Sequence, residues 1–471
     1  MESSSSPFHI LDRIHFNRFH WRSMLTTGMG VFTDGYDLSS VGIVLTIILA
    51  NFGLSSLTGI QSSLLAGSAL IGAMIGAMIG AIIFGMLGNR GRKTFYGLDV
   101  SIMAIAAVMQ AFVPNLSWLI AVRFVLGIGV GADYVLSPVI MAEHANAKDR
   151  GKTLAAGFGL TWGLGATAAA VLYLMLMAFH VPPDLIWRIV LGFGAIPALS
   201  VIYLRRKMPE TARFLARVKG DTGKASGVIN QVSGQTVPLT KVDADKRRLG
   251  EYWKTHGQRM IAASLLWFLF DMVAYSGILF GPSLIAKGLG LSSGNFQLLM
   301  EFGFVVPGAA MGLLLVDRWG RKPLQIAGFL GIAASLVAFS VYQGTAAAVP
   351  LISLLLYGGQ NFMSQAGPGS ISASGVLGVE LAPTKIRSLV QGFTVSSGRL
   401  GASLSAFVFP ALFHRWGESG AIMFLAGAAV LASLITLVWI PETRRMSLED
   451  TAGEEMGAQS AIAKGPLLTE S

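Results

Sequence analysis

The sequence predicts an all-α integral membrane protein with twelve transmembrane helices in two pseudo-symmetric six-helix bundles. Three observations predict this fold class: an apolar composition, twelve long apolar windows, and a repeat between the two halves of the chain. Of the 471 residues, 53% are hydrophobic and 13% are charged, whereas soluble proteins carry about 25% charged residues. The composition therefore favours a membrane protein and argues against a soluble enzyme.

Long apolar windows recur along the whole chain. A helix needs about 20 apolar residues to cross the hydrocarbon core of a bilayer. The windows cover residues 24–49, 61–87, 94–112, 116–141, 154–179, 185–204, 259–284, 296–315, 323–343, 346–379, 388–413 and 419–440. The window at 346–379 is longer than one span and predicts a tilted or bent helix.

Basic residues mark one side of the predicted membrane. Lys and Arg concentrate near the two termini and in alternate loops, which explains the net charge of +10 without nucleic acid. Because cytoplasmic loops carry the excess of Lys and Arg, we expect both termini in the cytoplasm and the chain in the plasma membrane. The expected organisation is an N-terminal segment, a bundle, a central loop, a second bundle and a tail, at residues 1–23, 24–204, 205–258, 259–440 and 441–471.

Four charged residues of the first half of the chain recur in the second half at an offset of 237 positions. Arg22, Asp34, Glu143 and Arg150 recur as Arg259, Asp271, Glu380 and Arg387. Duplicated six-helix halves are typical of secondary transporters, which bind substrate and coupling ion near the midplane between the halves. The repeat therefore predicts transport by alternating access.

Ionisable residues inside the apolar windows mark candidate functional positions, because charge is costly in hydrocarbon. Asp34 and Asp37 lie three residues apart in the first window and share a helical face. Asp133 and Asp271 lie in later windows, and Arg399 is the one obvious cation. Four ionised aspartates would be poorly compensated, so at least one should hold a proton. We expect Asp34, Asp37 and Asp133 to couple protons.

The seventh window carries a stripe of side chains suited to a binding cavity. Trp267, Asp271 and Tyr275 recur every four residues and so lie on one helical face. We expect Asp271 near the substrate and Arg399 as the group that attracts an anion, because a guanidinium fits phosphate and carboxylate equally. Core packing is the alternative role for Trp267 and Tyr275.

Other ionisable residues have expected structural roles. Arg123 is expected to pair with a helix end or with a carboxylate of the first helix, and direct substrate contact is the alternative. For Asp37, the alternative to proton coupling is a local hydrogen bond near Gly35. Asp99 and Glu301 lie toward window ends and are expected at the water interface.

Six motifs occur in order along the chain. They are GMLGNRGRK at 85–93, RFVLGIGVGADY at 123–134, MPETARFL at 208–215, GLLLVDRWGRK at 312–322, VELAPTKIRS at 379–388 and PETRR at 441–445. Together they resemble the motifs of the major facilitator superfamily. The resemblance implies gating or structural roles for Arg92, Arg123, Glu143, Arg150, Asp317, Arg321, Glu380 and Arg387. The first motif has Asn89 near the place where an aspartate is usual, which weakens the expected latch in the first half.

Within that superfamily, the chain resembles the phosphate:proton symporter branch and shares features with sugar porters. The run FTDGYDL at 32–38, the pair Asp133-Tyr134 and the stripe at 267, 271 and 275 carry this resemblance. It implies substrate contacts from Tyr134, Thr161, Trp267, Asp271, Tyr275 and Arg399. The branch usually has lysine where Arg399 stands, asparagine where Gly369 stands, and glutamine where Thr161 or Trp162 stands.

The expected function is proton-coupled symport of a small anion, with inorganic phosphate first. Aromatic or other organic acids and sugars are the alternatives, since DGYD at 34–37 is also typical of aromatic-acid:proton symporters. A solute sensor that binds without transport is the alternative from another class. The histidines lack metal-ligand spacing and no ATP-binding loop is present, so protons are the only expected cofactor. The expected partners are the substrate and the lipid bilayer, for a monomeric chain.

Overall fold

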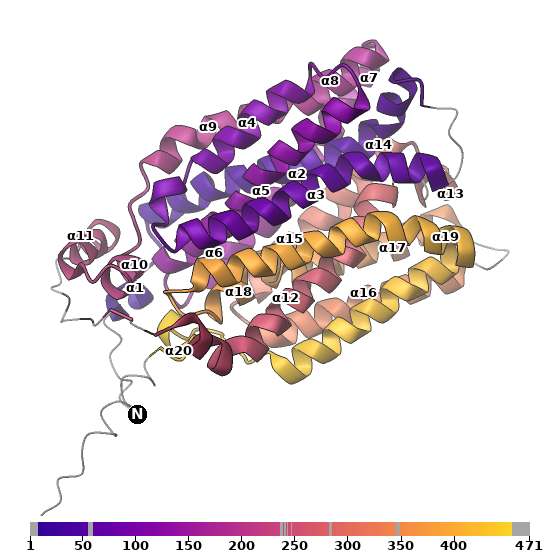
Figure 1. Cartoon of the computed structure of the whole chain (residues 1–471). Helices are drawn as coiled ribbons and strands as arrows, with labels where there is room; N and C mark the ends of the chain where they lie inside the picture. Colours follow the sequence, from indigo (N-terminus) through magenta and orange to yellow (C-terminus); the bar gives the residue numbers. More distant parts are fainter. Residues whose placement is uncertain are drawn as a thin grey trace, which may run out of the picture.

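The chain folds into helices that run side by side in two groups, one from each half of the sequence (Figure 1). The computed structural model describes residues 8–454, except 55–59, 236–238, 240, 241, 243, 246, 282–284, 344 and 346–348. These described ranges contain no strand. The predicted all-α, twelve-span architecture is confirmed, although several spans are interrupted helices.

The first bundle contains six spans. They are α2 (Arg18–Asn51), α3 (Ile60–Gly88), α4 (Leu98–Gln110), α5 (Leu116–His144), α6–η2–α7 (Arg150–Ala155, Ala156–Leu160, Thr161–Ala178) and α8–α9 (Pro183–Phe193, Ala195–Arg206). Asn17 and Asn115 begin α2 and α5 as caps, since their side chains accept from the backbone N–H groups of the first turn.

The second bundle repeats this plan. Its spans are α12 (Leu249–Phe280), α14–η4–α15 (Ser293–Met300, Glu301–Val305, Val306–Leu315), α16 (Arg321–Gln343), α17–η5 (Pro350–Ser364, Gln365–Gly369) and the two helices of α19 (Arg387–Trp439). Gly417 separates the two helices of α19, because its φ of 72° is non-helical. The segments η2, η4 and η5 are π-turns.

Several helix boundaries differ from the sequence prediction, among them the following three. Arg205, expected in the central loop, lies in the last turn of α9. Helix α12 begins at Leu249, ten residues before the expected span. The window at 346–379 is not one bent span, because η5 ends at Gly369 and a turn leads to the separate helix α18 (Val376–Glu380). Apolar composition alone does not distinguish a membrane span from an apolar turn that follows it in the sequence.

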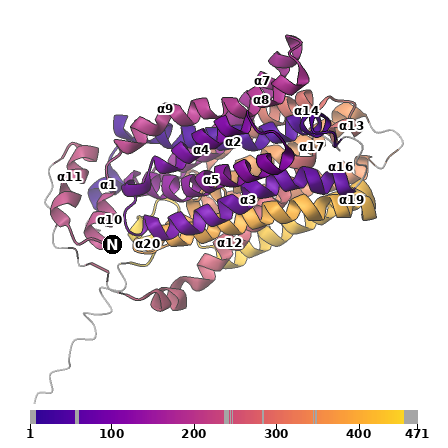
Figure 2. The ribbon, with the colours of Figure 1, turned by 45° about the horizontal axis from the view of Figure 1, so that its top comes forward.

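The bundles meet along two seams. At one seam α3 lies beside α19 (Figure 2), and at the other α7 packs against α14 and η4. Glycines allow close packing inside the first bundle, where a side chain at Gly76 or Gly127 would collide with the backbone of the neighbouring helix. The glycines of α3 between Gly72 and Gly85 thus lie against α5 and α19.

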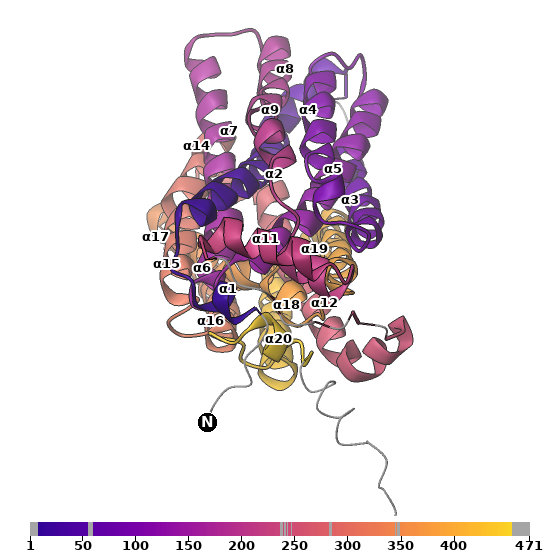
Figure 3. The same ribbon diagram turned by 90° about the vertical axis from the view of Figure 1, so that its left-hand side faces the viewer.

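Short helices cover the end of the bundles at which the N-terminus lies (Figure 3). They are α1 (His9–Arg13), α10 (Ala212–Arg217), α11 (Thr222–Ser233), α18 and α20 (Leu448–Thr451). We call this end the terminal face. Its described helices come from both halves of the chain, so it bridges the two bundles.

Candidate functional site

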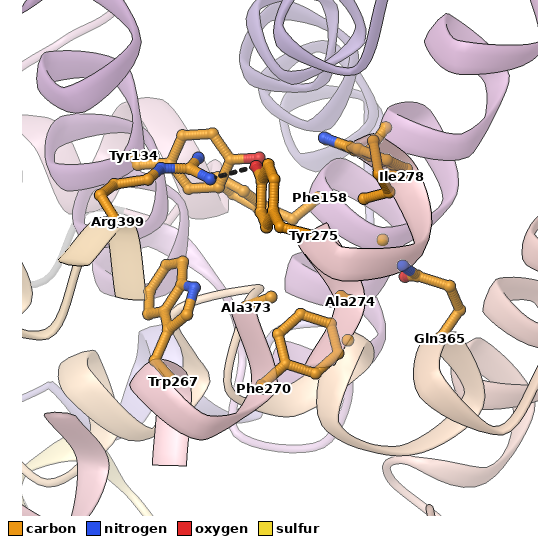
Figure 4. Close-up of a pocket in the computed structure, with 13 residues that line it drawn as sticks. Tyr134, Phe158, Trp267, Phe270, Ala274, Tyr275, Ile278, Gln365, Ala373 and Arg399 are labelled. Atoms are coloured by element: carbon orange, nitrogen blue, oxygen red, sulfur yellow. Dashed lines mark hydrogen bonds between the residues drawn. The ribbon is translucent and has the colours of Figure 1, made fainter. Parts of the chain in front are cut away.

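A small cavity lies between the two bundles near the middle of the spans (Figure 4). Its volume is about 40 Å³. Its lining comes from α5, η2, α7, α12, η5, α19 and the turn after η5: Tyr134, Phe158, Gly159, Trp162, Trp267, Phe270, Ala274, Tyr275, Ile278, Gln365, Gly369, Ala373 and Arg399. Six of the thirteen lining residues are aromatic, and Arg399 is the cation among them.

Arg399 of α19 is buried and joins both bundles at this cavity. Its guanidinium donates to the hydroxyl of Tyr275 and lies 3.5 Å from a carboxylate oxygen of Asp34 and 3.5 Å from one of Asp271. It also stacks 4.6 Å from the ring centroid of Tyr134. The repeat-related pair, Asp34 and Asp271, thus flanks one arginine from opposite halves.

The polar atoms around Arg399 are incompletely paired. Asp34 Oδ1 and Arg399 Nε are buried without a hydrogen-bond partner among the described residues. Two carboxylates and one guanidinium also leave one negative charge in excess when both aspartates are ionised. A site with spare donors, spare acceptors and excess negative charge is suited to take up protons and a polar ligand.

The predicted stripe on α12 faces this region. Trp267 Nε1 donates to Asp271 Oδ1 at 3.1 Å, and the Trp267 ring lies 6.0 Å from that of Tyr134. Trp267 and Tyr275 line the cavity directly, whereas Asp271 reaches it through Arg399. The two aromatic residues therefore combine packing with a place at the cavity wall.

Thr161 does not line the cavity, contrary to the substrate contact expected for it. Its hydroxyl donates to the carbonyl of Gly157 at 2.7 Å, and the neighbouring Trp162 lines the cavity instead. The π-turn η2 immediately precedes Thr161 and inserts one residue into the helix, which changes the face that each later side chain takes. Gln365, in the π-turn η5, supplies an amide that the sequence did not single out.

Asp133 belongs to a second buried cluster, away from the cavity that its neighbour Tyr134 lines. Arg205 Nη1 lies 2.7 Å from Asp133 Oδ1 and 2.6 Å from Asp99 Oδ2. Asp99 is fully buried, so its expected place at the water interface was wrong. Successive residues on a helix point about 100° apart, which explains how residues 133 and 134 serve different clusters.

Arg205 is the residue that the sequence prediction missed. Its remaining donors reach the backbone carbonyls of Thr26 at 3.3 Å and Thr27 at 3.1 Å. A side chain at Gly30 would collide with both Arg205 and Asp133, so this glycine lets α2 approach the pair. The available signal was the shortage of cations for the buried aspartates, since charges inside a membrane usually pair with one another.

Replacing Arg205 with methionine should destabilise the first bundle by about 3 kcal/mol, because the change leaves two buried carboxylates without a counter-charge. The triple variant that adds Asp99→Asn and Asp133→Asn should recover most of this loss. Unfolding of the purified protein in detergent measures both effects. Arg206→Met is the matched control, since its side chain is exposed; equal stability of Arg205→Met and Arg206→Met would contradict the prediction.

Asp37 of α2 and Arg123 of α5 lie in a third buried region, away from the cavity. Arg123 Nη1 donates to Gln110 Oε1 at 2.9 Å, and Arg123 is the cation that acts most strongly on Asp37. Both carboxylate oxygens of Asp37 are buried without a hydrogen-bond partner among the described residues, and they lie against Gly194. Arg123 thus contacts Gln110 directly, and its expected pairing with a carboxylate of the first helix stays a prediction.

The predicted gating residues other than Arg123 meet at the terminal face in two reciprocal clusters. Glu143 of the first half contacts Arg387 of the second half at 2.8 Å and Arg92 of its own half at 3.3 Å. The repeat-related Glu380 contacts Arg150 of the first half at 2.8 Å and Arg321 of its own half at 2.9 Å. Each glutamate therefore pairs with one arginine of its own half and one of the other half. The two arginines that cross between the halves, Arg150 and Arg387, are themselves related by the offset of 237 positions.

These clusters join the two halves of the chain at the terminal face. Burial opposes ionisation of Glu380, but Arg321 and Arg150 prevail and lower its pKa to about 2, so it stays ionised at neutral pH. Asp317 accepts from the backbone N–H of Lys152 at 2.7 Å and pairs with Arg321 at 2.7 Å. We name Arg92, Glu143, Arg150, Asp317, Arg321, Glu380 and Arg387 the terminal-face network.

The first half contacts the second half at the terminal face even though Asn89 stands near the place where an aspartate is usual. Asn89 makes no bridge comparable to that of Asp317, and its side-chain oxygen is buried without a hydrogen-bond partner among the described residues. Arg92 instead reaches across to the carbonyl of Thr384 at 2.6 Å. The weak first-half latch expected from Asn89 is therefore offset by a direct contact from the motif arginine.

Comparisons with known proteins agree with this architecture. A family model described as "Sugar (and other) transporter" matches residues 23–453. The chain is 30% identical to the "Probable inorganic phosphate transporter 1-6" of Arabidopsis thaliana, over 96% of this chain and 97% of the relative. It is 31% identical to the "Probable inorganic phosphate transporter 1-10" of Oryza sativa subsp. japonica, over 98% of this chain and 94% of the relative.

A solved structure shares the fold at lower identity. The major facilitator superfamily proton:xylose symporter XylE, bound to 6-bromo-6-deoxy-D-glucose, superimposes with a TM-score of 0.79. The match has 22% sequence identity and covers 93% of this chain and 99% of that chain. For an inward open conformation of the xylose transporter XylE from E. coli, the TM-score is 0.66.

Proposed function

Because the chain belongs to the sugar (and other) transporter family of the major facilitator superfamily, we propose that it carries inorganic phosphate across a membrane together with protons. The chain is a membrane transporter and not an enzyme. The observation that carries the proposal is Arg399, held between Asp34 and Asp271 from opposite halves at the central cavity. The names of the two plant relatives support phosphate as the anion.

Arg399 is suited to an oxyanion because a guanidinium presents several N–H donors in a plane and keeps its charge. The hydroxyls of Tyr134 and Tyr275 and the amide of Gln365 add hydrogen-bonding groups at the same cavity. We assign substrate contact to Tyr134, Trp267, Tyr275 and Arg399, with Asp271 acting through Arg399. Trp162 and Gln365 replace Thr161 in this assignment.

Charge balance explains why protons would accompany the anion. With Asp34 and Asp271 both ionised, their two negative charges already exceed the single positive charge of Arg399. An anion entering the cavity would add further negative charge in a low-dielectric site. Protonation of either aspartate frees the guanidinium for the anion. Anion and proton therefore bind best together, which is the thermodynamic basis of symport. Asp34 is the central coupling residue of the proposal, and Asp37 and Asp133 are the further ones.

Alternating access follows from the arrangement of the two bundles. In the proposed cycle, the terminal-face network, which joins the two halves in this structure, closes one end, and separation of its arginines from its glutamates opens that end. We propose that the terminal face is cytoplasmic, that the membrane is the plasma membrane, and that the chain works as a monomer. The proposed moving units are residues 24–204 and 259–440, flanked by terminal segments 1–23 and 441–471. They are joined by the segment 205–258, which holds the end of α9, helices α10 and α11, and the start of α12.

An aromatic carboxylate is the second candidate substrate. The observation that favours it is the aromatic lining contributed by Phe158, Trp162, Trp267 and Phe270. Arg399 would bind its carboxylate as it would bind phosphate, so the cation does not separate the two substrates.

Uptake by the full chain in proteoliposomes tests the proposal. With the outside more acidic than the lumen, labelled phosphate should accumulate and the accumulation should collapse when the pH gradient is dissipated. Benzoate and xylose, assayed in parallel, separate phosphate from an aromatic acid and a sugar. Accumulation of benzoate alone would replace phosphate as substrate, and tight phosphate binding without flux would indicate a sensor.

A further inference from the structure

Glu301 is a buried carboxylate to which the phosphate mechanism assigns no role. It begins the π-turn η4 between α14 and α15, and it is 2% exposed, so its expected place at the water interface was wrong. Gln297 Nε2 donates to its Oε1 at 2.7 Å. Its Oε2 is buried without a hydrogen-bond partner in the described part of the chain.

No cation compensates Glu301 in the described ranges. It forms no ion pair there, and its one side-chain partner is the neutral amide of Gln297. An ionised carboxylate in such surroundings would cost several kcal/mol or more. The neutral acid avoids this cost, and its O–H supplies the donor that the second oxygen lacks. Glu301 is therefore expected to hold a proton in this conformation.

Glu301 lies in a segment that forms part of the seam between the two bundles. The α14–η4 segment packs against α7 of the other bundle, so Glu301 lies beside a seam that must change when the bundles rock. Tyr173 is the titratable residue of α7, and Tyr357 is that of α17, which packs on η4 from the same bundle. Helix α2, which carries Asp34 and Asp37, also contacts α14. The helices on either side of η4, α14 and α15, carry no charged residue.

The π-turn itself favours a site that changes with conformation. One inserted residue leaves the helix locally wide, and such turns occur frequently at functional sites. Glu301 is the first residue of this turn, and Gly303 follows two positions later. A small rearrangement of η4 would therefore move the carboxyl group relative to α7.

We propose that Glu301 is a further proton-binding site of the transporter, loaded from water when the α7–α14 seam is open and neutral when the seam is closed. The site gains one proton and changes from carboxylate to carboxylic acid, and it releases that proton in the opposite step. This inference rests on the proposed proton-coupled transport. It adds one coupled proton in the second half, distinct from the one shared around Arg399.

Two measurements on the full chain test the proposal, with Glu301→Gln as the variant and Glu251→Gln as the control. Glu251 is exposed at the start of α12, so its replacement should change neither measurement. Infrared difference spectra across a pH titration should show a protonated-carboxyl band that Glu301→Gln lacks and Glu251→Gln retains. An unaltered band in Glu301→Gln would overturn the proposal.

The second measurement is phosphate accumulation at a set pH gradient in proteoliposomes. Loss of one coupled proton should lower the maximal accumulation ratio about tenfold per pH unit of gradient. A ratio equal to that of the wild type would show that the proton is not coupled, which also overturns the proposal. A wild-type chain that moves no phosphate would refute the proposed function instead, and the infrared result would still decide whether Glu301 binds a proton.

Discussion

Replacing Arg399 with methionine is expected to reduce phosphate uptake by about a hundredfold or more. The change leaves Asp34 and Asp271 without their shared cation and removes the group that attracts the anion. Breaking a buried charge cluster in this way costs about 3–5 kcal/mol, and each 1.4 kcal/mol corresponds to a tenfold change. Initial rates of labelled phosphate uptake at low concentration measure the loss.

Two variants separate the charge of Arg399 from general damage to the fold. Arg399→Lys keeps the positive charge but not the planar fork of donors, so it should retain a substantial part of the uptake. Arg415→Met changes an exposed arginine of the same helical segment and should behave like the wild type. Uptake by Arg399→Met equal to that by Arg415→Met would remove Arg399 from the binding site.

The Asp34→Asn variant is expected to lose one coupled proton, so that gradient-driven accumulation weakens while phosphate exchange across the membrane continues. Asparagine is similar in shape to the protonated aspartate, so the cavity can still bind and reorient with the anion. It cannot release a proton, however, and the accumulation ratio should fall about tenfold per pH unit of gradient. Accumulation and phosphate–phosphate counterflow, measured in the same vesicles, separate coupling from binding.

The control for Asp34→Asn is Asp184→Asn, which removes a carboxylate that pairs with Arg188 at the exposed start of α8. This variant should keep both activities. If Asp34→Asn accumulates phosphate as well as Asp184→Asn does, Asp34 is not a coupling residue. Loss of both accumulation and counterflow would assign Asp34 to substrate binding.

Much of the architecture could be predicted because its causes are local in the sequence. The apolar windows specify helices through length and composition alone. The repeat of Asp34 as Asp271 and of Glu143 as Glu380 predicts equivalent places in two bundles, which the structure shows at Arg399 and at the terminal face. Helical periodicity similarly brings Trp267 and Tyr275 to one cavity wall.

The partners of the buried charges could not be predicted in the same way. Arg205 lies at the basic end of an apolar window, and its place in the sequence does not distinguish a loop from the last turn of a buried helix. Only the packing of α2, α4, α5 and α9 brings it to Asp99 and Asp133. Whether a charge is compensated depends on residues distant in the chain.

By itself, the sequence determined the class of protein, the helices, the internal repeat and the residue types available for an anion and protons. The tertiary structure alone decided which residues of each helix meet. The π-turns show the reason. After η2, Trp162 lines the cavity in place of the expected Thr161. The turn η4 carries Glu301 and packs against α7 at the seam. A single inserted residue rotates every later side chain by about 100°, and hydrophobic periodicity is too degenerate in an apolar span to reveal it.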